Sequence, residues 1–159
     1  MLEDPAAKHI ILAIVPPGED RTTLNKILSQ ANWQLIFSDT FAETQTALRT
    51  LSVAVVLSEV RLSDGHSWKD VLQELDAARS RTPLIVADRL ADEVLWAEVL
   101  NLGGHDVLAK PFNPGELLYA VAAAGRFREN ELKRTAVIRK PAASAAVSAR
   151  TQRAAVGCG

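Results

Sequence analysis

Residues 53–57 read Val-Ala-Val-Val-Leu, and Ser58 and Glu59 follow directly. All five side chains of the run are apolar and three are β-branched, so a strand formed here would be buried on both faces. Such a strand is typical of the centre of a parallel sheet that helices cover on both sides. The run therefore predicts a central strand and places Ser58 and Glu59 at its carboxyl end.

Shorter β-like runs alternate with helix-period segments on either side of this strand. We expect four further strands, at residues 10–15, 33–37, 83–87 and 106–109. Sequence signals mark the helices between and after them: Asp20 as a cap, Thr40 with Glu43, Ser67 with Asp70, the stop Gly103-Gly104, and Asn113 before Pro114. The alternation favours a parallel α/β sheet over a helical bundle or a sandwich.

Each expected helix carries apolar residues at a spacing that predicts a buried face. These residues are Leu24, Ile27, Leu28 and Ala31; Phe41, Leu48 and Leu51; Val71, Leu72 and Leu75; Val94, Leu95, Val99 and Leu102; and Leu117, Leu118, Val121 and Ala124.

The composition is that of an ordinary globular protein. The chain has 159 residues, 48% of them hydrophobic and 23% charged, with a net charge of −1. A single cysteine, Cys158, excludes an intramolecular disulfide and a Cys-rich zinc site. The longest aliphatic run, residues 10–15, is too short to span a bilayer, and the acidic start does not resemble a signal peptide. We therefore expect a cytoplasmic location.

Charge is divided unevenly along the chain. Residues 130–159 carry six basic side chains and one acidic one, whereas residues 1–129 carry 12 basic and 18 acidic ones. The last segment is rich in Ala and Ser and cannot bury enough surface to offset its ordering entropy. We expect one folded domain over residues 8–129 and a loosely structured basic tail over 130–159. The tail has no aromatic residues, so we do not expect it to bind nucleic acid.

Ligands of parallel sheets bind beyond the carboxyl ends of the strands, so the residues there are the candidate site. They include Pro16-Pro17, Ser58-Glu59, Asp88-Arg89 and Lys110-Pro111. Glu59 is followed six residues later by Gly65 of an Asp-Gly pair, and Lys110-Pro-Phe112 follows Gly-Gly-His-Asp. With the order of strands and helices, these motifs resemble the receiver domain of two-component response regulators over residues 8–128.

The resemblance implies a flavodoxin-like (βα)5 receiver fold with strand order 2-1-3-4-5 and a cis bond between Lys110 and Pro111. In that family an aspartate after the third strand accepts a phosphoryl group, and an acidic pair after the first strand helps it hold Mg²⁺. A Ser or Thr after the fourth strand and the lysine contact the phosphoryl oxygens, and an aromatic residue on the fifth strand reports the change.

At four of these five functional positions, this chain carries a residue type that differs from that of the family. The acidic pair falls on Pro16 and Pro17, the phosphoacceptor on Glu59, the Ser/Thr on Asp88 and the aromatic on Val107. Prolines supply no side-chain oxygen, and an ionised aspartate donates no hydrogen bond. Only Lys110 matches, so we expect a pseudo-receiver with no Mg²⁺, no other cofactor and no catalytic residue.

The charges that remain allow two readings of the pocket. We expect Glu59, Asp88 and Lys110 to converge, so that a lysine–carboxylate ion pair closes the site. Glu59 then either imitates a phosphorylated state or forms a purely structural pair. Glu19 and Asp20 could partly replace the lost acids as metal ligands, although capping of the first helix explains them better.

Other polar residues point to ordinary structural roles. His9, His66 and His105 show no metal-ligand spacing, and Ser58 lacks the partners of a nucleophile. No enzyme motif occurs, so we expect a protein that is not an enzyme. Trp96 lies off the expected inward stripe of its helix. In receivers the face of the fourth helix, fifth strand and fifth helix is the usual partner and dimer surface, so Trp96 is a candidate anchor there.

The sequence thus predicts a stand-alone receiver-like protein that acts by phosphorylation-independent contact with another signalling protein, a sensor kinase or a regulator. A homodimer through the same face is an additional candidate. Two alternatives stay open: a phosphorylatable receiver with an unusual acceptor site, and a small-ligand binder that uses the same cleft.

Overall fold

The computed structural model describes residues 9–135, and the chain divides into two compact units, residues 1–128 and 129–159. In the first unit, five parallel strands form one sheet in the order β2-β1-β3-β4-β5. The strands are β1 (His9–Ile14), β2 (Trp33–Ser38), β3 (Val53–Glu59), β4 (Leu84–Asp88) and β5 (Asp106–Ala109). The predicted sheet and its strand order are therefore confirmed.

Helices connect the strands as expected. They are α1 (Glu19–Leu28), α2 (Phe41–Thr50), α3 (Trp68–Ala77) and α4 (Glu93–Leu102), and a last helix begins at residue 114 and fills the first unit to residue 128. Residues 129–135 of the second unit are helical as well. The first residues of the expected tail, 130–135, are thus helical, whereas residues 136–159, with Cys158, lie outside the described residues.

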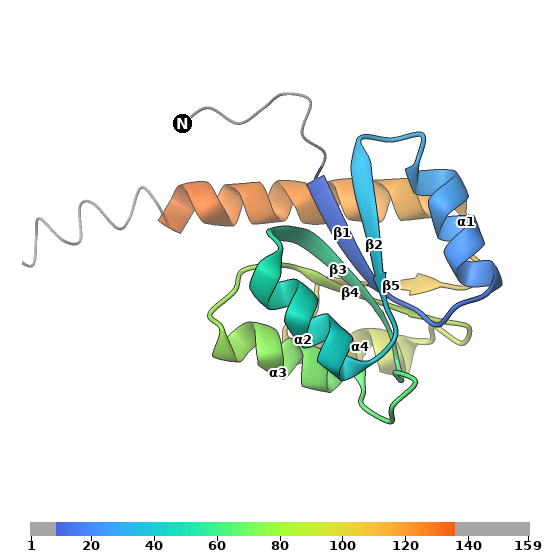
Figure 1. Ribbon diagram of the computed structural model, residues 1–159, viewed down its shortest axis with the longest axis horizontal. Helices are drawn as coiled ribbons and strands as arrows, with labels where there is room; N and C mark the ends of the chain where they lie inside the picture. Colours follow the sequence, from blue (N-terminus) through green and yellow to red (C-terminus); the bar gives the residue numbers. More distant parts are fainter. Residues whose placement is uncertain (1–8, 136–159) are drawn as a thin grey trace, which may run out of the picture. The chain divides into compact units, whose positions relative to one another are not determined.

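The sheet is covered on both faces, which explains its apolar central strand. The helices α2, α3 and α4 lie on one face, and α1 and the last helix lie on the other (Figure 1). Side chains of β3 alternate between the two cores: Val55 and Leu57 pack on the side of α1, and Val56 packs on the side of α3. All three are fully buried, as the sequence predicts.

Several helix ends use the residues that the sequence marks for them. Ser67 forms a complete capping box with Asp70 at the start of α3. Gly103 ends α4 in the left-handed conformation, with φ of 106°. The Asn113 side chain accepts a 3.0 Å hydrogen bond from the Glu116 backbone N–H at the start of the last helix.

The start of α2 is completed by a distant residue. The Thr40 side chain accepts a 3.2 Å hydrogen bond from the Glu43 N–H, and the Phe41 N–H donates at 2.8 Å to Asp64 in the loop after β3. The bond from Phe41 lowers the pKa of the Asp64 carboxyl. Asp64 therefore does more than form the turn with Gly65, because it ties this loop to the first turn of α2.

The predicted buried faces are correct for α3 and wrong in part for α4. Val94 and Leu102 are 75% and 50% exposed, and Val99 is the one fully buried residue of α4. The helix is apolar on nearly every side, so the spacing of apolar residues does not identify its inward face. Smaller deviations occur at Leu51 and Leu118, which are exposed, and at Ala31, Phe41 and Leu48, which are half-buried. Within residues 9–135, no helix has the length and apolarity needed to cross a membrane.

Candidate functional site

The carboxyl ends of β1, β3, β4 and β5 lie along one edge of the sheet, and Lys110 follows β5 there. Its backbone N–H donates to the Asp88 carbonyl at 3.1 Å, which fixes the residue beside the end of β4. The Lys110–Pro111 bond is cis, as the family resemblance implies. The Lys110 side chain is only 8% exposed, so its ammonium group needs partners within the protein.

Two carboxylates supply these partners. Lys110 Nζ donates to Glu59 Oε1 at the end of β3, and it donates to Asp20 Oδ2 at 3.2 Å. The side chains of Glu59 and Asp20 are 18% and 21% exposed. The expected contact between Glu59 and Lys110 is therefore present, and a second carboxylate joins it.

Asp20 does not have the capping role that the sequence predicts. The N-cap of α1 is Gly18, and no side chain caps this end of the helix. Asp20 lies in the first turn of α1 and turns to Lys110 and to the Arg89 guanidinium, whose Nη2 is 4.0 Å away. A largely buried ammonium is a stronger partner for a carboxylate than a solvated backbone N–H, which explains the difference.

Asp88 does not converge on Lys110 as expected. Its Oδ2 accepts a 3.2 Å hydrogen bond from the Leu90 N–H, two residues further along the chain. Short acidic side chains commonly bond to the backbone nearby in this way. The predicted trio of Glu59, Asp88 and Lys110 is therefore wrong in one member, and the observed trio is Asp20, Glu59 and Lys110.

The electrostatics of the trio favour a charged lysine. Burial disfavours the ammonium and acts to lower the pKa of Lys110, but the hydrogen bonds that Lys110 donates to Glu59 and Asp20 outweigh burial and raise that pKa. With Arg89 beside Asp20, two cations face two carboxylates. The charges of the site are thus neutralised by one another within the protein.

The positions that correspond to a metal site lack the groups for one. Pro16 and Pro17 are exposed and supply neither a side-chain oxygen nor a backbone N–H. The carboxylates of Glu59 and Asp20 both point to the Lys110 ammonium, which competes with any cation for their oxygens. Mg²⁺ prefers octahedral oxygen ligands, so these residues fit it poorly. Across residues 9–135, no cluster of three His, Cys, Asp or Glu side chains suits a metal ion.

The remaining predicted residues lie outside the trio. Val107 is half-buried in β5 and packs with the core on the α3 side. Its side chain carries no polar group. Trp96 is 51% exposed on α4. Ser58 is buried and donates at 2.8 Å to the Glu59 carbonyl, and His66 lies 3.1 Å from Asp64 and stacks on Phe41. These contacts are structural.

Sequence reasoning missed the contributions of Asp20 to the trio and of Arg89 beside it. Asp20 lies 90 residues from Lys110, and no local pattern reports such a contact. The available signal is chemical: a buried lysine that has lost two acidic neighbours needs a replacement carboxylate, and Asp20 lies four residues after Pro16 at the same sheet edge.

Known proteins resemble this domain in both sequence and fold. The transcriptional regulatory protein FixJ of Bradyrhizobium diazoefficiens is 31% identical over 126 residues, covering 79% of this chain and 61% of FixJ. The response regulator GraR of Staphylococcus saprophyticus is 32% identical over 117 residues, covering 68% of this chain and 49% of GraR. The chain thus spans about half to three fifths of the length of these relatives. No family model matches the chain.

Solved structures agree with the sequence relatives. Full-length FixJ of B. japonicum superposes with a TM-score of 0.66 at 29% identity, covering 88% of this chain and 68% of FixJ. The signal receiver domain of an HD domain-containing protein from Pseudomonas fluorescens Pf-5 shares the fold, with a TM-score of 0.69 at 22% identity and coverage of 77% and 98%. Residues 9–128 therefore form a response regulator receiver domain.

Proposed function

We propose that this receiver domain signals by contact with another protein and without being phosphorylated. The observation that carries the proposal is the Lys110 ammonium, which Glu59 and Asp20 already bind. In the receiver family this lysine binds the phosphoryl group. Here its charge is satisfied by the chain itself.

The same geometry opposes phosphoryl transfer to Glu59. A phosphoryl donor would bring negative charge beside Asp20, Glu59 and Asp88, and repulsion between close like charges amounts to roughly 4 kcal/mol per pair at 4 Å and an effective dielectric constant of 20. A bound Mg²⁺ normally offsets this repulsion, but Pro16 and Pro17 leave it few oxygen ligands. We therefore expect neither Mg²⁺ binding nor phosphorylation, and a signalling role instead of an enzymatic one.

The position of Glu59 supports the alternative in which this residue imitates a phosphorylated state. It places a carboxylate oxygen on Lys110, where a phosphorylated receiver would present a phosphoryl oxygen. Asp20 adds a second oxygen from α1, 3.2 Å from the same nitrogen. Two anionic oxygens on one ammonium give the lysine an environment close to the one that a phosphoryl group provides.

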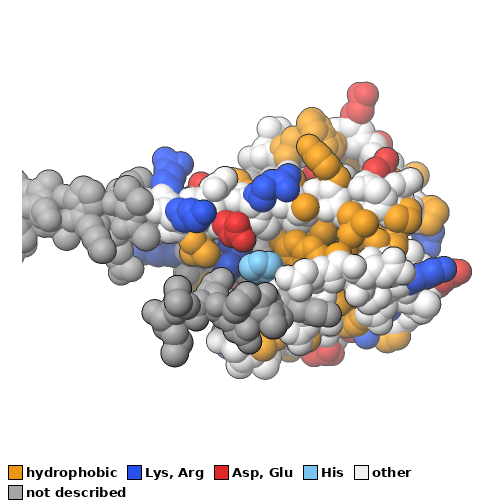
Figure 2. Space-filling model, turned by 90° about the horizontal axis from the view of Figure 1, so that it is seen from above, with side chains coloured by type: hydrophobic (Ala, Val, Ile, Leu, Met, Phe, Trp, Pro, Cys, Tyr) orange, Lys and Arg blue, Asp and Glu red, His pale blue; other side chains and the backbone are white. Residues whose placement is uncertain are grey.

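The partner in this proposal is a sensor kinase or another regulator in the cytoplasm, and Trp96 is its anchor. Trp96 and Leu100 are exposed on α4, and Tyr119 is 72% exposed on the last helix. Figure 2 shows the domain from the side of α1 and the last helix, across the sheet from α4, and hydrophobic side chains gather there as well. Exposed aromatic residues are frequent energetic centres of interfaces, and a second copy of the chain could use the same face.

Exposure to acetyl phosphate and Mg²⁺, followed by intact mass spectrometry, tests the proposal. We expect no species heavier by about 80 Da, the mass of one added phosphoryl group. A phosphorylatable receiver in the same reaction controls for the reagents. A stoichiometric adduct that Glu59→Gln abolishes would contradict the proposal and would establish an unusual acceptor site.

A variant with Pro16→Asp, Pro17→Asp and Glu59→Asp is the matched control within the chain. It restores an acidic pair and a shorter acceptor while keeping Lys110, so we expect it to gain the adduct. The gain would show that wild-type protein lacks the ligands for the reaction and that the reagents can reach the site.

A further inference from the structure

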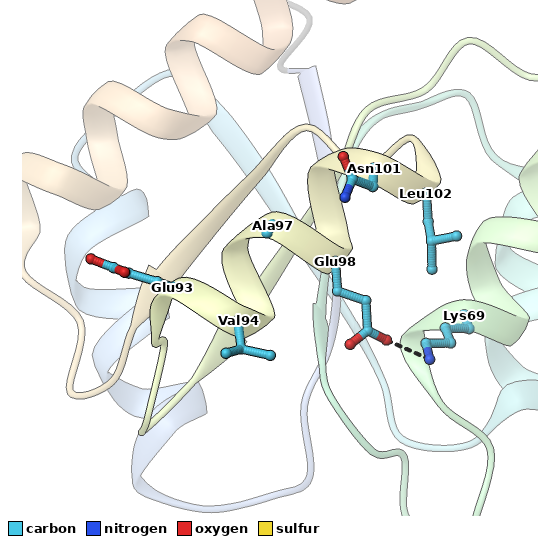
Figure 3. A pocket seen from close by; sticks show the side chains of 7 residues that line it. All are labelled: Lys69, Glu93, Val94, Ala97, Glu98, Asn101 and Leu102. Carbon is cyan, nitrogen blue, oxygen red and sulfur yellow. Dashed lines mark ion pairs between the residues drawn. The ribbon is translucent and has the colours of Figure 1, made fainter.

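The outer edge of β2 carries backbone N–H and C=O groups that have no partner among the described residues. β2 is an edge strand of the sheet and pairs with β1 alone. Other polar groups at the surface are satisfied within the chain. In the hollow beside α4, for example, the Lys69 and Glu98 side chains form an ion pair (Figure 3). The edge of β2 is therefore the surface that calls for a partner.

The open groups belong to Trp33, Leu35 and Phe37. The Val15 N–H donates to the Ser38 carbonyl at 3.0 Å, so the backbone groups of Ser38 point toward β1. Backbone groups of successive strand residues point to opposite sides of the strand, which places the even-numbered residues of β2 against β1. The N–H and C=O groups of the three odd-numbered residues therefore point away from the sheet.

β2 lacks the features that usually protect an edge strand from pairing with another chain. Its sequence, Trp-Gln-Leu-Ile-Phe-Ser, contains no charged residue and no proline. Its register with β1 is continuous from end to end, without a bulge. Trp33, Leu35, Ile36 and Phe37 are only half-buried, so apolar surface is open beside the unpaired backbone groups. Such an edge is a ready template for another strand.

The other edge strand, β5, is protected by its own sequence. It has four residues, against six in β2, and it begins with Asp106. The Lys110 N–H donates to the Asp88 carbonyl in β4, so by alternation the Val107 N–H points outward. The Asp106 carboxylate accepts a 2.8 Å hydrogen bond from that Val107 N–H. The chain thus satisfies an outward group at β5 and leaves those at β2 open within residues 9–135.

The symmetry of the open groups indicates a second copy of this chain as the partner. Trp33 and Phe37 lie two residues on either side of Leu35, so an antiparallel copy related by a two-fold axis at Leu35 brings open groups opposite open groups. Leu35 then faces Leu35, and Trp33 faces Phe37 of the other copy. These side chains lie on one face of the sheet, and aromatic pairs across strands stabilise such contacts. No like charges meet, because the strand is uncharged.

We propose that two copies of the domain pair through their β2 edges, antiparallel and centred on Leu35, so that their sheets join into one. Each facing pair exchanges two backbone hydrogen bonds, which gives about six across the contact. The contact is small, so we expect a reversible dimer with a Kd on the order of micromolar. Trp96 lies on α4, which connects β4 and β5 at the opposite edge. The dimer therefore goes beyond the proposed function and does not depend on it.

Amide hydrogen exchange on the full chain, followed by NMR at about 20 μM and about 1 mM protein, tests the register. We expect the amides of Trp33, Leu35 and Phe37 to exchange several-fold more slowly at the higher concentration, because only the dimer gives them acceptors. The amides of Gln34 and Ile36 face β1 at both concentrations and are the internal control. Protection of the three amides that does not change with concentration would overturn the proposal, whether the amides are slow or fast throughout.

Sedimentation of variants distinguishes this dimer from one formed through α4. Leu35→Lys places two ammonium groups opposite one another at the axis, so we expect the dimer to weaken tenfold or more. Gln30→Lys adds the same charge at an exposed position outside the strand, and it should leave the dimer unchanged, as should Trp96→Ala.

Leu35 is half-buried, so the amide spectrum of Leu35→Lys is compared with that of the wild type to verify the fold. The exchange pattern of the wild-type protein decides the question even if this variant unfolds. A dimer that Trp96→Ala abolishes and Leu35→Lys preserves, or a protein that stays monomeric at about 1 mM, would overturn the proposal.

Discussion

Lys110 is the residue on which the site depends, because one buried ammonium holds two carboxylates from distant parts of the chain. Glu59 arrives from the end of β3 and Asp20 from the first turn of α1. Removal of the ammonium would leave Glu59 without a cation and Asp20 with only the exposed Arg89, whose Nη2 is 4.0 Å away. The three side chains should therefore behave as one energetic unit.

Lys110→Met is expected to lower the free energy of unfolding by roughly 1–3 kcal/mol, less than for a fully buried pair because both acids keep some exposure. Asp20→Asn alone should cost less, since the amide oxygen still accepts the hydrogen bond from the lysine. In the Lys110→Met background Asp20→Asn should be neutral or stabilising, because it removes one of two neighbouring negative charges that have lost their shared ammonium. Urea unfolding of the four proteins measures the coupling, and additive effects of the two substitutions would contradict it.

His105 should make stability depend on pH. Burial lowers the pKa of His105, although the nearby Asp106 charge acts in the opposite direction. Among the described residues, its buried Nδ1 has no hydrogen-bond partner. As pH falls below about 7, the unfolded chain takes up this proton before the folded one, so the free energy of unfolding should decrease toward pH 5.

Urea unfolding at several pH values checks this contribution. His105→Gln should flatten the pH dependence, whereas His66→Gln, at a surface histidine paired with Asp64, is the comparison variant. A pH profile that His105→Gln leaves unchanged would assign the effect to other groups.

At the scale of elements, the end of α4 is set by two glycines with different roles. Gly103 adopts the left-handed conformation that ends the helix, and Gly104 lies against Val99, the buried residue of α4. A Cβ atom on Gly104 would lie 2.4 Å from Val99 Cγ1 and 3.0 Å from its carbonyl oxygen. The second glycine is therefore required by close packing.

Gly104→Ala should lower the free energy of unfolding by about 1–3 kcal/mol, because the Val99 side chain and backbone must move to admit the methyl group. Gly115→Ala is the control, and we expect a smaller effect there. Its one close contact is the Asn113 side-chain oxygen at 3.3 Å, which can shift more easily than the Val99 backbone. Thermal unfolding of both variants measures the contrast, and equal effects would contradict the packing argument.

For the whole molecule, the proposed absence of a metal site predicts that Mg²⁺ leaves stability unchanged. A site with a Kd of about 1 mM would add about 1.4 kcal/mol at 10 mM Mg²⁺ and raise Tm by several degrees. We expect no rise beyond that in NaCl of equal ionic strength, which controls for charge screening. A specific increase in Tm with Mg²⁺ would contradict the proposal.

Much of the fold could be predicted because its signals are local or periodic. The apolar run at 53–57 marks the central strand, and Ser67 and Gly103 mark helix ends. The inward face of α4 could not be predicted, since the helix itself carries apolar residues on nearly every side. In the site, Glu59 and Lys110 follow from the strand ends, whereas the roles of Asp20 and Asp88 depend on competition between local hydrogen bonds and a distant ammonium, which sequence spacing does not report.

The shielding of Lys110 has a consequence for covalent modification of the protein. Acylation of an amine needs its unprotonated form, and in Lys110 the proton is held by two carboxylates while the nitrogen is largely out of reach of solvent. Lys26 and Lys69 are open to reagents by comparison. Acetylating enzymes and amine-directed labels should therefore modify the surface lysines first. Lys110, at the carboxyl ends of the strands, should keep its positive charge.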